Sequence, residues 1–225
     1  MKNILCYGDS NTYGYIPNEG GRYPYDIRWT GRLQKLFGDT ARILEEGLNG
    51  RTTVWEDPIE GFKSGKSYLI PCLNTHAPID AFVLMLGTND LKNRFSLTAS
   101  EIASGCDTLI KLVKMETACC QGYVPEILLV APMIVPEAIG THSFGGMFVG
   151  PDCDRRSRDF SKCYRAVAEA NSCHFMDAAE YVSVSDKDFL HMDEKGHEVF
   201  ANAIYQKLKE ILNKYTAAGR SHRNA

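Results

Sequence analysis

The residues with the clearest chemical potential in this chain stand directly after predicted strands. An apolar run at residues 4–7 ends in Gly8-Asp9-Ser10, which leaves a serine hydroxyl at the carboxyl end of a first strand. In an open α/β sheet, ligands bind at that end of the strands. A serine there is a candidate nucleophile only if the chain also supplies a base, a group that orients the base, and donors for an oxyanion.

A candidate base and its orienting group lie in Asp188-x-x-His191. On a tight turn, residues three apart can meet, so the carboxylate can accept a hydrogen bond from the imidazole Nδ1–H. That contact would leave Nε2 free to take a proton from serine. His197, with Asp193 as its partner, and His174 are alternative bases. His197 falls in the first turns of a predicted helix and His174 on a predicted strand, which favours packing roles for both.

Candidate oxyanion donors follow the first three predicted strands. Acyl transfer builds negative charge on the former carbonyl oxygen, so donors must point at that spot beforehand. The backbone N–H of Ser10 is one donor, and Gly50 can offer another because no Cβ blocks the approach. Asn89 can offer a neutral amide N–H that does not titrate. We interpret Asp9 and Asp90 as acceptors for backbone N–H groups in turns, without a chemical role.

Strands and helices alternate along the chain and would place these residues at one edge of a sheet. We expect strands at 4–7, 41–44, 79–86, 126–131 and 173–177. We expect helices at 26–37, 98–118, 154–170 and 193–215, and within 64–76 up to Pro71. This alternation predicts an α/β fold with a mostly parallel five-stranded sheet covered on both faces.

Two irregular segments could shape a binding pocket. Residues 133–153 are rich in proline and glycine and carry several apolar side chains. A connection this long inside a compact domain is usually a lid, a pocket wall or an interface, and we expect a lid or a subunit contact. Tyr13 and Tyr15 lie close to Ser10 in the sequence, where packing of the loop and lining of a substrate pocket are equally consistent interpretations.

Composition fits one domain and excludes several classes of partner. The 225 residues suffice for one α/β domain with a core, which we assign to residues 1–215. The small, polar and basic residues 216–225 predict a disordered tail. A net charge of −3 disfavours nucleic acid as a partner. No stretch approaches the roughly 20 apolar residues of a membrane span, so we expect no membrane partner.

Cysteine and histidine usage bears on location and on metals. The N-terminus lacks the apolar core of a signal peptide, so we expect a cytoplasmic protein with eight reduced cysteines. Cys72, Cys106, Cys119 and Cys120 fall in apolar helical patterns and should pack as small hydrophobes. No C-x-x-C or H-E-x-x-H occurs, and the histidines show no ligand spacing. We therefore expect no metal and no cofactor.

The strand-end residues resemble the four sequence blocks of SGNH (GDSL-type) hydrolases. The matching residues appear in the family's order between residue 4 and about residue 200: Gly8-Asp9-Ser10, Gly50, Gly87-x-Asn89-Asp90 and Asp188-x-x-His191. Asn11 stands where the name-giving pattern has leucine, a position without a chemical role. The resemblance implies a flavodoxin-like three-layer α/β/α fold. It also implies a site made of Ser10 as nucleophile, His191 as base, Asp188 as orienting group, and Ser10, Gly50 and Asn89 as the oxyanion hole.

A closer similarity is to the arylesterase/acyltransferase branch of this family, typified by the mycobacterial acyltransferase. The residues that carry it are Arg28-Trp29-Thr30-Gly31, Glu45-Glu46-Gly47-Leu48, Arg51-Thr52-Thr53 and Leu86-Gly87-Thr88-Asn89-Asp90. Members act on short acyl esters, often assemble as oligomers, and in some cases transfer acyl groups to alcohols or peroxide. The resemblance implies that Tyr15 lines the acyl pocket, and it is weakest over residues 133–153.

We therefore predict a serine esterase that hydrolyses short-chain acetyl or aryl esters through an acyl-enzyme, with a small-molecule ester as its partner. An acyltransferase or perhydrolase, or a carbohydrate acetylesterase, could use the same site. The sequence is also compatible with a homo-oligomer. The other class to weigh is a binding module in which Gly8 to Thr12 cradles a phosphate. That interpretation leaves Asp188, His191 and Asn89 without a shared purpose.

Overall fold

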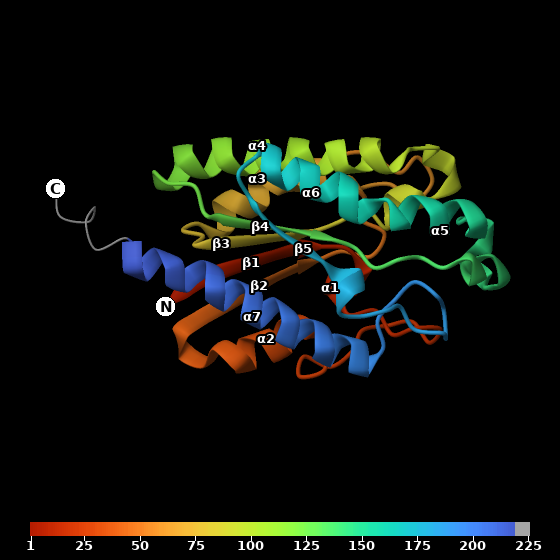
Figure 1. Ribbon diagram of the computed structural model, residues 1–225, viewed down its shortest axis with the longest axis horizontal. Helices are drawn as coiled ribbons and strands as arrows, with labels where there is room; N and C mark the ends of the chain where they lie inside the picture. The colour runs from red at the N-terminus through yellow and green to blue at the C-terminus, as the bar shows by residue number, and fades with distance from the viewer. Residues whose placement is uncertain (219–225) are drawn as a thin grey trace.

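One sheet of five parallel strands forms the centre of the computed structural model, which describes the backbone of residues 1–218 and the side chains of residues 1–213. The strands are β1 (Lys2–Gly8), β2 (Ala41–Gly47), β3 (Ala81–Met85), β4 (Glu126–Ala131) and β5 (His174–Asp177), in the order β2-β1-β3-β4-β5. Helices α3 (Gly65–His76), α4 (Ala99–Gln121) and α6 (Phe160–Ala170) cover one face, and α2 (Trp29–Phe37) and α7 (Glu194–Ala218) cover the other (Figure 1). The predicted α/β/α sandwich is confirmed.

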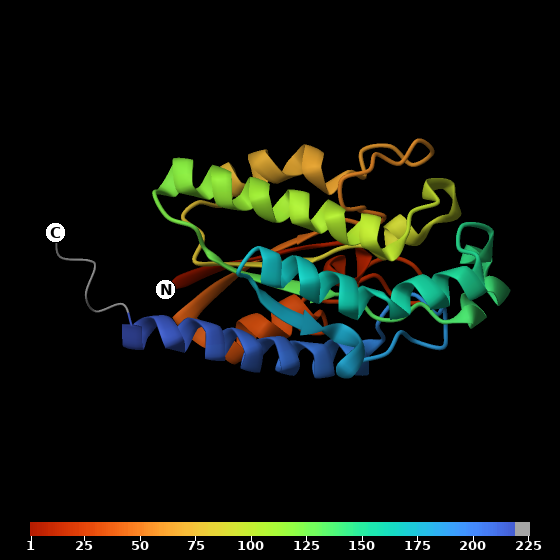
Figure 2. The same ribbon diagram turned by 45° about the horizontal axis from the view of Figure 1, so that its top comes forward.

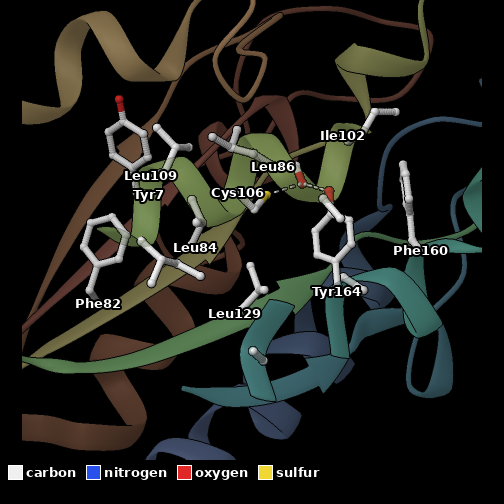
Figure 3. Close-up of a cluster of buried hydrophobic side chains, with 14 of the residues drawn as sticks. Tyr7, Phe82, Leu84, Leu86, Ile102, Cys106, Leu109, Leu129, Phe160 and Tyr164 are labelled. Carbon is white, nitrogen blue, oxygen red and sulfur yellow. Dashed lines mark hydrogen bonds between the residues drawn. The ribbon is translucent and has the colours of Figure 1, made fainter. Parts of the chain in front are cut away.

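Both faces of the sheet are buried, because side chains alternate along each central strand. In β1, Leu5 belongs to the apolar cluster shared with α3, α4 and α6, whereas Ile4 belongs to the cluster shared with α2 and α7. Figure 3 shows part of the first cluster, in which the Tyr164 hydroxyl donates a hydrogen bond to the Leu86 carbonyl at 2.7 Å. The two cores hold the strand ends in defined positions.

The strand order reverses at β1, since β2 lies on one side of it and β3 on the other. Gly8 is paired with Gly47 of β2 and with Met85 of β3, so the three strands end level with one another. A reversal of this kind opens a crevice at the carboxyl ends of the strands, where ligands bind. The loops that follow the strands gather at the end of the molecule away from the N-terminus (Figures 1 and 2).

Helix α3 continues through Pro71 to His76, so the prediction that it ends at Pro71 is wrong. Proline lacks an N–H and normally disrupts a helix interior. Here Leu69, Cys72 and Leu73 are fully buried against the core. Most helical stability in proteins comes from such packing, which outweighs the local preference of one residue.

The segment predicted as one helix over 154–170 forms two, α5 (Gly150–Arg158) and α6, which meet at Asp159. Pro151 stands in the first turn of α5, where its missing N–H is not needed. The helix therefore begins at residue 150 rather than 154.

The remainder of the 133–153 segment contains two short 3₁₀ turns, Glu137–Thr141 and Ser143–Gly146. Ile139, in the first turn, and Phe148, after the second, are buried in the core. The segment is therefore folded onto the domain, and its role as a lid or an interface stays a prediction.

All eight cysteines lie within the described residues and are free thiols. Cys72 and Cys106 are buried as predicted, but Cys119 and Cys120 are exposed, so that part of the prediction is wrong. These two residues lie in the last turn of α4, where the helix extends past the core. Within residues 1–218, no helix combines the length and the hydropathy that a membrane span requires. Helix α7 reaches Ala218, and the rest of the predicted tail lies outside the described residues.

Candidate active site

Ser10 begins the short helix α1 (Ser10–Tyr13), directly after β1. The Asp9 carboxylate accepts a hydrogen bond from the Asn11 N–H at 2.9 Å and caps this turn. A Cβ at Gly8 would lie 2.1 Å from Thr12 Oγ1, so only glycine lets the turn fold back so tightly against the strand. The serine hydroxyl is thereby held at the strand end, largely buried.

The structure brings Ser10, His191 and Asp188 into one hydrogen-bonded row. His191 Nε2 lies 2.9 Å from Ser10 Oγ, and His191 Nδ1 lies 2.6 Å from Asp188 Oδ2. The other carboxylate oxygen, Asp188 Oδ1, accepts the backbone N–H groups of Leu190 at 3.0 Å and of His191 at 2.9 Å. The tight turn expected from the D-x-x-H spacing therefore exists, and it directs Nε2 at the serine.

The environment of Asp188 keeps its carboxylate ionised. Burial by itself would raise the pKa of Asp188, but the hydrogen bonds and the charge of His191, together with the N–H of Leu190, hold this pKa below its ordinary value. A buried anion beside Nδ1 stabilises the imidazolium that forms when Nε2 accepts a proton.

Asn11 also contributes to this geometry, and this role was not predicted from the sequence. Its side-chain Nδ2 donates to the Leu190 carbonyl at 3.2 Å, and its Oδ1 accepts the Met192 N–H at 2.9 Å. Both contacts lie on the loop that carries His191. Asn11 thus ties the serine turn to the histidine loop, a role that an amide next to the serine could have suggested.

Asn89 and Gly50 lie around the same cavity as the serine. A cavity of about 120 Å³ is lined by Ser10, Gly50, Asn89 and His191, among others. One N–H of the Asn89 amide donates to the Arg51 carbonyl at 3.1 Å, which orients the side chain. The amide has a second N–H that this hydrogen bond does not use. Gly50 has φ +80°, and a Cβ there would lie 2.6 Å from Glu60 Oε2. Glycine is therefore required at this position.

Aromatic rings cover the histidine, and they distinguish the two tyrosines near Ser10. The Tyr15 ring lies against the His191 ring with centroids 4.4 Å apart, and Phe144 approaches it from another side at 6.0 Å. Both side chains line the cavity. Tyr13 is not among the residues lining this cavity and packs under the Arg22 guanidinium at 4.4 Å instead.

The alternative bases are placed away from Ser10. His197 is fully buried, and its Nδ1 accepts the Trp29 N–H at 3.3 Å. Burial lowers the pKa of His197 to about 3, so the ring stays neutral. His174 Nε2 lies 2.7 Å from Glu126 Oε2, at the opposite ends of β4 and β5 from the cavity. Neither ring contacts the serine.

Asp9 and Asp90 hold loops, as expected. The Asp90 carboxylate accepts the Thr53 N–H at 3.0 Å and the Thr53 hydroxyl at 2.6 Å, which ties the loop after β2 to the turn after β3. Burial raises the pKa of Asp90 to about 7 despite these bonds, and it raises the pKa of Asp9 to about 6.

A cluster of charged side chains, of which Lys92 and Asp57 are buried, reaches one wall of the cavity, and it was not predicted. The Lys92 ammonium pairs with Glu60 Oε1 at 2.5 Å and with Asp57 Oδ2 at 3.4 Å. Arg94 pairs with Asp57 at 2.9 Å. Lys92 and Glu60 line the cavity. These partners come from two separate loops, and neither loop shows by itself that the pairs form.

The five-stranded parallel sheet, with its helices on both faces and this edge of functional side chains, defines the SGNH hydrolase class of fold. Residues 6–199 match the model of the GDSL-like lipase/acylhydrolase family, and the chain belongs to that family.

Solved structures support the same assignment. A carbohydrate acetylesterase from Sinorhizobium meliloti is 35% identical, with a TM-score of 0.87 over 94% of this chain and 100% of that one. The aryl esterase of M. smegmatis is 32% identical, with a TM-score of 0.86 over 93% of this chain and 99% of that one. The comparison with curated proteins gives no match. The chain is a carboxylic ester hydrolase with arylesterases and carbohydrate acetylesterases as its structural neighbours.

Proposed function

We propose that this esterase hydrolyses short acyl esters through a covalent acyl-enzyme on Ser10, with His191 as general base and Asp188 as the group that orients it. The observation that carries the proposal is the 2.9 Å contact between His191 Nε2 and Ser10 Oγ inside a small cavity. A nucleophile and a base within hydrogen-bond distance, with the base held by a third group, meet the geometric requirement for nucleophilic catalysis.

In the first half of the reaction, His191 Nε2 takes the proton of Ser10 as Oγ attacks the ester carbonyl carbon. The carbonyl oxygen becomes an oxyanion, for which we propose the N–H groups of Ser10 and Gly50 and the side-chain amide of Asn89 as donors. The tetrahedral intermediate collapses, His191 gives its proton to the leaving alcohol, and the acyl group stays on Oγ. Water then attacks the acyl-enzyme as His191 takes its proton. The bond from the acyl carbon to Oγ breaks, His191 returns the proton to Ser10 Oγ, and the acid leaves.

The size and lining of the cavity support a short acyl group. At about 120 Å³ it is far smaller than the 300–1,000 Å³ typical of pockets for drug-sized ligands. Phe144, Met147, Phe148 and Leu190 supply apolar walls, and we propose that Tyr15 lines the acyl position. An acetyl group fits this description better than a long chain does.

The direct test is Ser10→Ala, assayed with p-nitrophenyl acetate. The expected result is loss of turnover by several orders of magnitude, since no other hydroxyl contacts His191 Nε2 among the described residues. Ser143→Ala, at an exposed serine of the neighbouring segment, is the matched control and should retain activity. A phosphonofluoridate should label Ser10. Near-normal turnover of Ser10→Ala would contradict the proposal.

A second candidate, acyl transfer to an alcohol, uses the same acyl-enzyme. The rings of Tyr15 and Phe144 against His191 favour it, because an apolar wall beside the base favours an alcohol over water. Transesterification and hydrolysis measured together in a water–alcohol mixture separate the two. Tyr15→Ala should shift the ratio toward hydrolysis if this wall matters, and an unchanged ratio would argue against it.

We also propose a cytoplasmic location for this protein. The eight free thiols support a reducing, cytoplasmic compartment. A homo-oligomer stays a prediction.

A further inference from the structure

A second group of reactive side chains lies outside the cavity that holds Ser10. Glu46 comes from β2, and Cys72 and His76 come from α3. One carboxylate oxygen, the thiol sulfur and one imidazole nitrogen of these residues all lie within 4.8 Å of one another. Cys72 and His76 are four residues apart in a helix, so their side chains project from the same face. The three donors therefore converge on one point between strand and helix.

We propose that Glu46, Cys72 and His76 form a binding site for one divalent cation of the zinc type. Thiolate, imidazole and carboxylate are the three side-chain donors that Zn²⁺ prefers. With Cys72 and Glu46 ionised and His76 neutral, the two negative charges balance the charge of the ion. The spacing of the histidines by itself does not indicate this site, because Glu46 comes from a different element.

The present distances need only a small adjustment to hold an ion. Ligand bonds of about 2.0–2.3 Å in a tetrahedron place the donor atoms about 3.3–3.6 Å apart. His76 Nε2 and Glu46 Oε1 are now hydrogen-bonded at 2.7 Å, so this pair must open. Glu46 and His76 are half-buried, and the opening requires the Glu46 carboxylate to rotate away from the imidazole. Binding replaces this hydrogen bond with two bonds to the ion.

The Cys72 thiol must lose its proton for this to happen. Burial, assisted by the nearby charge of Glu46, raises the pKa of Cys72 to about 12, although the charge of Arg51 opposes the rise. A coordinated thiol is deprotonated outright by the ion. The S–H bond breaks as the sulfur–metal bond forms, and the proton goes to solvent. Each ion bound at neutral pH therefore releases one proton from Cys72.

A route for the ion and for a fourth ligand exists on the side of Glu46. Glu46 and Tyr68 line a second cavity of about 950 Å³, which also contacts Arg51 and Ser64. Water in this cavity can complete the coordination of the ion. None of the residues that line the second cavity lines the cavity of Ser10. The proposed cation site therefore lies outside the Ser10 cavity and can be tested without an activity assay.

The test uses the full chain with Cys119→Ser and Cys120→Ser as background, because these two exposed neighbouring thiols could bind soft metals themselves. Reduced, metal-free protein is titrated with Co²⁺, which gives a charge-transfer absorbance when a thiolate binds it. We expect this band to saturate at one equivalent, to vanish when Zn²⁺ is added, and to be accompanied by release of about one proton per ion.

Variants of the ligands decide whether the band comes from the proposed site. Cys72→Ser should abolish it, and His76→Gln should weaken binding at least as much as the 10–100-fold typical of lost supporting contacts. Cys163→Ser, a half-buried thiol of α6, is the matched control and should leave the titration unchanged. Circular dichroism checks that each variant is folded. If Cys72→Ser does not fold, His76→Gln tests the site instead, because His76 is only half-buried. No band at one equivalent, a band that survives in folded Cys72→Ser, or an unchanged affinity in folded His76→Gln, would overturn the proposal.

Discussion

His191 and His197 are both buried and lie only six residues apart in the chain, yet their surroundings differ in kind. His191 has a carboxylate at Nδ1, 2.6 Å away, and a hydroxyl at Nε2, 2.9 Å away. His197 accepts the backbone N–H of Trp29 at Nδ1, and its Nε2 has no hydrogen-bond partner among the described residues. One imidazole can exchange protons with a neighbour, whereas the other is held neutral.

The aspartates explain the difference. Asp188 turns back on the loop and meets the imidazole three residues later. Asp193 precedes His197 by four residues, but its carboxylate accepts the Gly196 N–H at 2.7 Å and caps α7. Asp188 uses one oxygen for backbone N–H groups and the other for the imidazole, whereas no hydrogen bond joins the Asp193 carboxylate to the His197 ring among the described residues.

The largest expected effect separates the two histidines directly. His191→Gln should reduce kcat by several orders of magnitude, because it removes the proposed base, whereas His197→Gln should change kcat by no more than a few-fold. Steady-state kinetics with p-nitrophenyl acetate measures both. The comparison fails if the two variants lose similar activity while both remain folded.

A smaller effect is expected at the oxyanion. Asn89→Ala should reduce kcat by about 10²–10³ with little change in KM, because the lost hydrogen bond strengthens as charge develops on the carbonyl oxygen. Asn93→Ala, at an amide in the next turn that does not line the cavity, serves as the control. A reduction of only a few-fold would remove Asn89 from the proposed donors.

The smallest effect is on stability, and it belongs to His197. Its pKa is about 3 when folded and 6.5 ordinarily, so between these values the unfolded chain binds a proton that the folded chain does not. The free energy of unfolding should therefore fall as pH drops below 6.5, by about 2 kcal/mol at pH 5 (1.5 pH units at 1.36 kcal/mol each).

Urea unfolding at pH 7 and pH 5 measures this contribution. The decrease between the two pH values should be about 2 kcal/mol smaller in His197→Gln than in the unmodified protein, since other titrating groups contribute equally to both. Equal decreases would mean that His197 does not titrate as its burial implies.

Much of the fold was predictable because its signals are local. The apolar run at 79–86 indicated a central strand, and β3 lies within it. The failures occurred where packing outweighed local preference. Pro71 should end a helix, but the burial of Leu69 and Leu73 keeps α3 helical beyond it. Cys119 matched an apolar pattern but is exposed, because pattern alone does not show where a long helix leaves the core.

Some residues of the candidate site were also predictable from local sequence, and others were not. Ser10, Gly50, Asn89 and the Asp188–His191 pair could all be named from strand ends and spacing. The structure places Ser10, Gly50, Asn89 and His191 around one cavity, with Asp188 hydrogen-bonded to His191. Asn11 and the Lys92–Glu60 pair were missed. Each depends on a partner from a distant loop, which the residue type alone does not identify.

The amino-acid sequence by itself determined which chemical groups stand at the strand ends and that Asp188 can reach His191, because both follow from residue types and from turns of a few residues. The folded chain was needed to show which imidazole meets the serine, since Ser10 and His191 are 181 positions apart and lie on segments that follow β1 and β5 of the sheet. It was also needed to show that Glu46 joins Cys72 and His76, because a strand and a helix must pack before three donors can face one point.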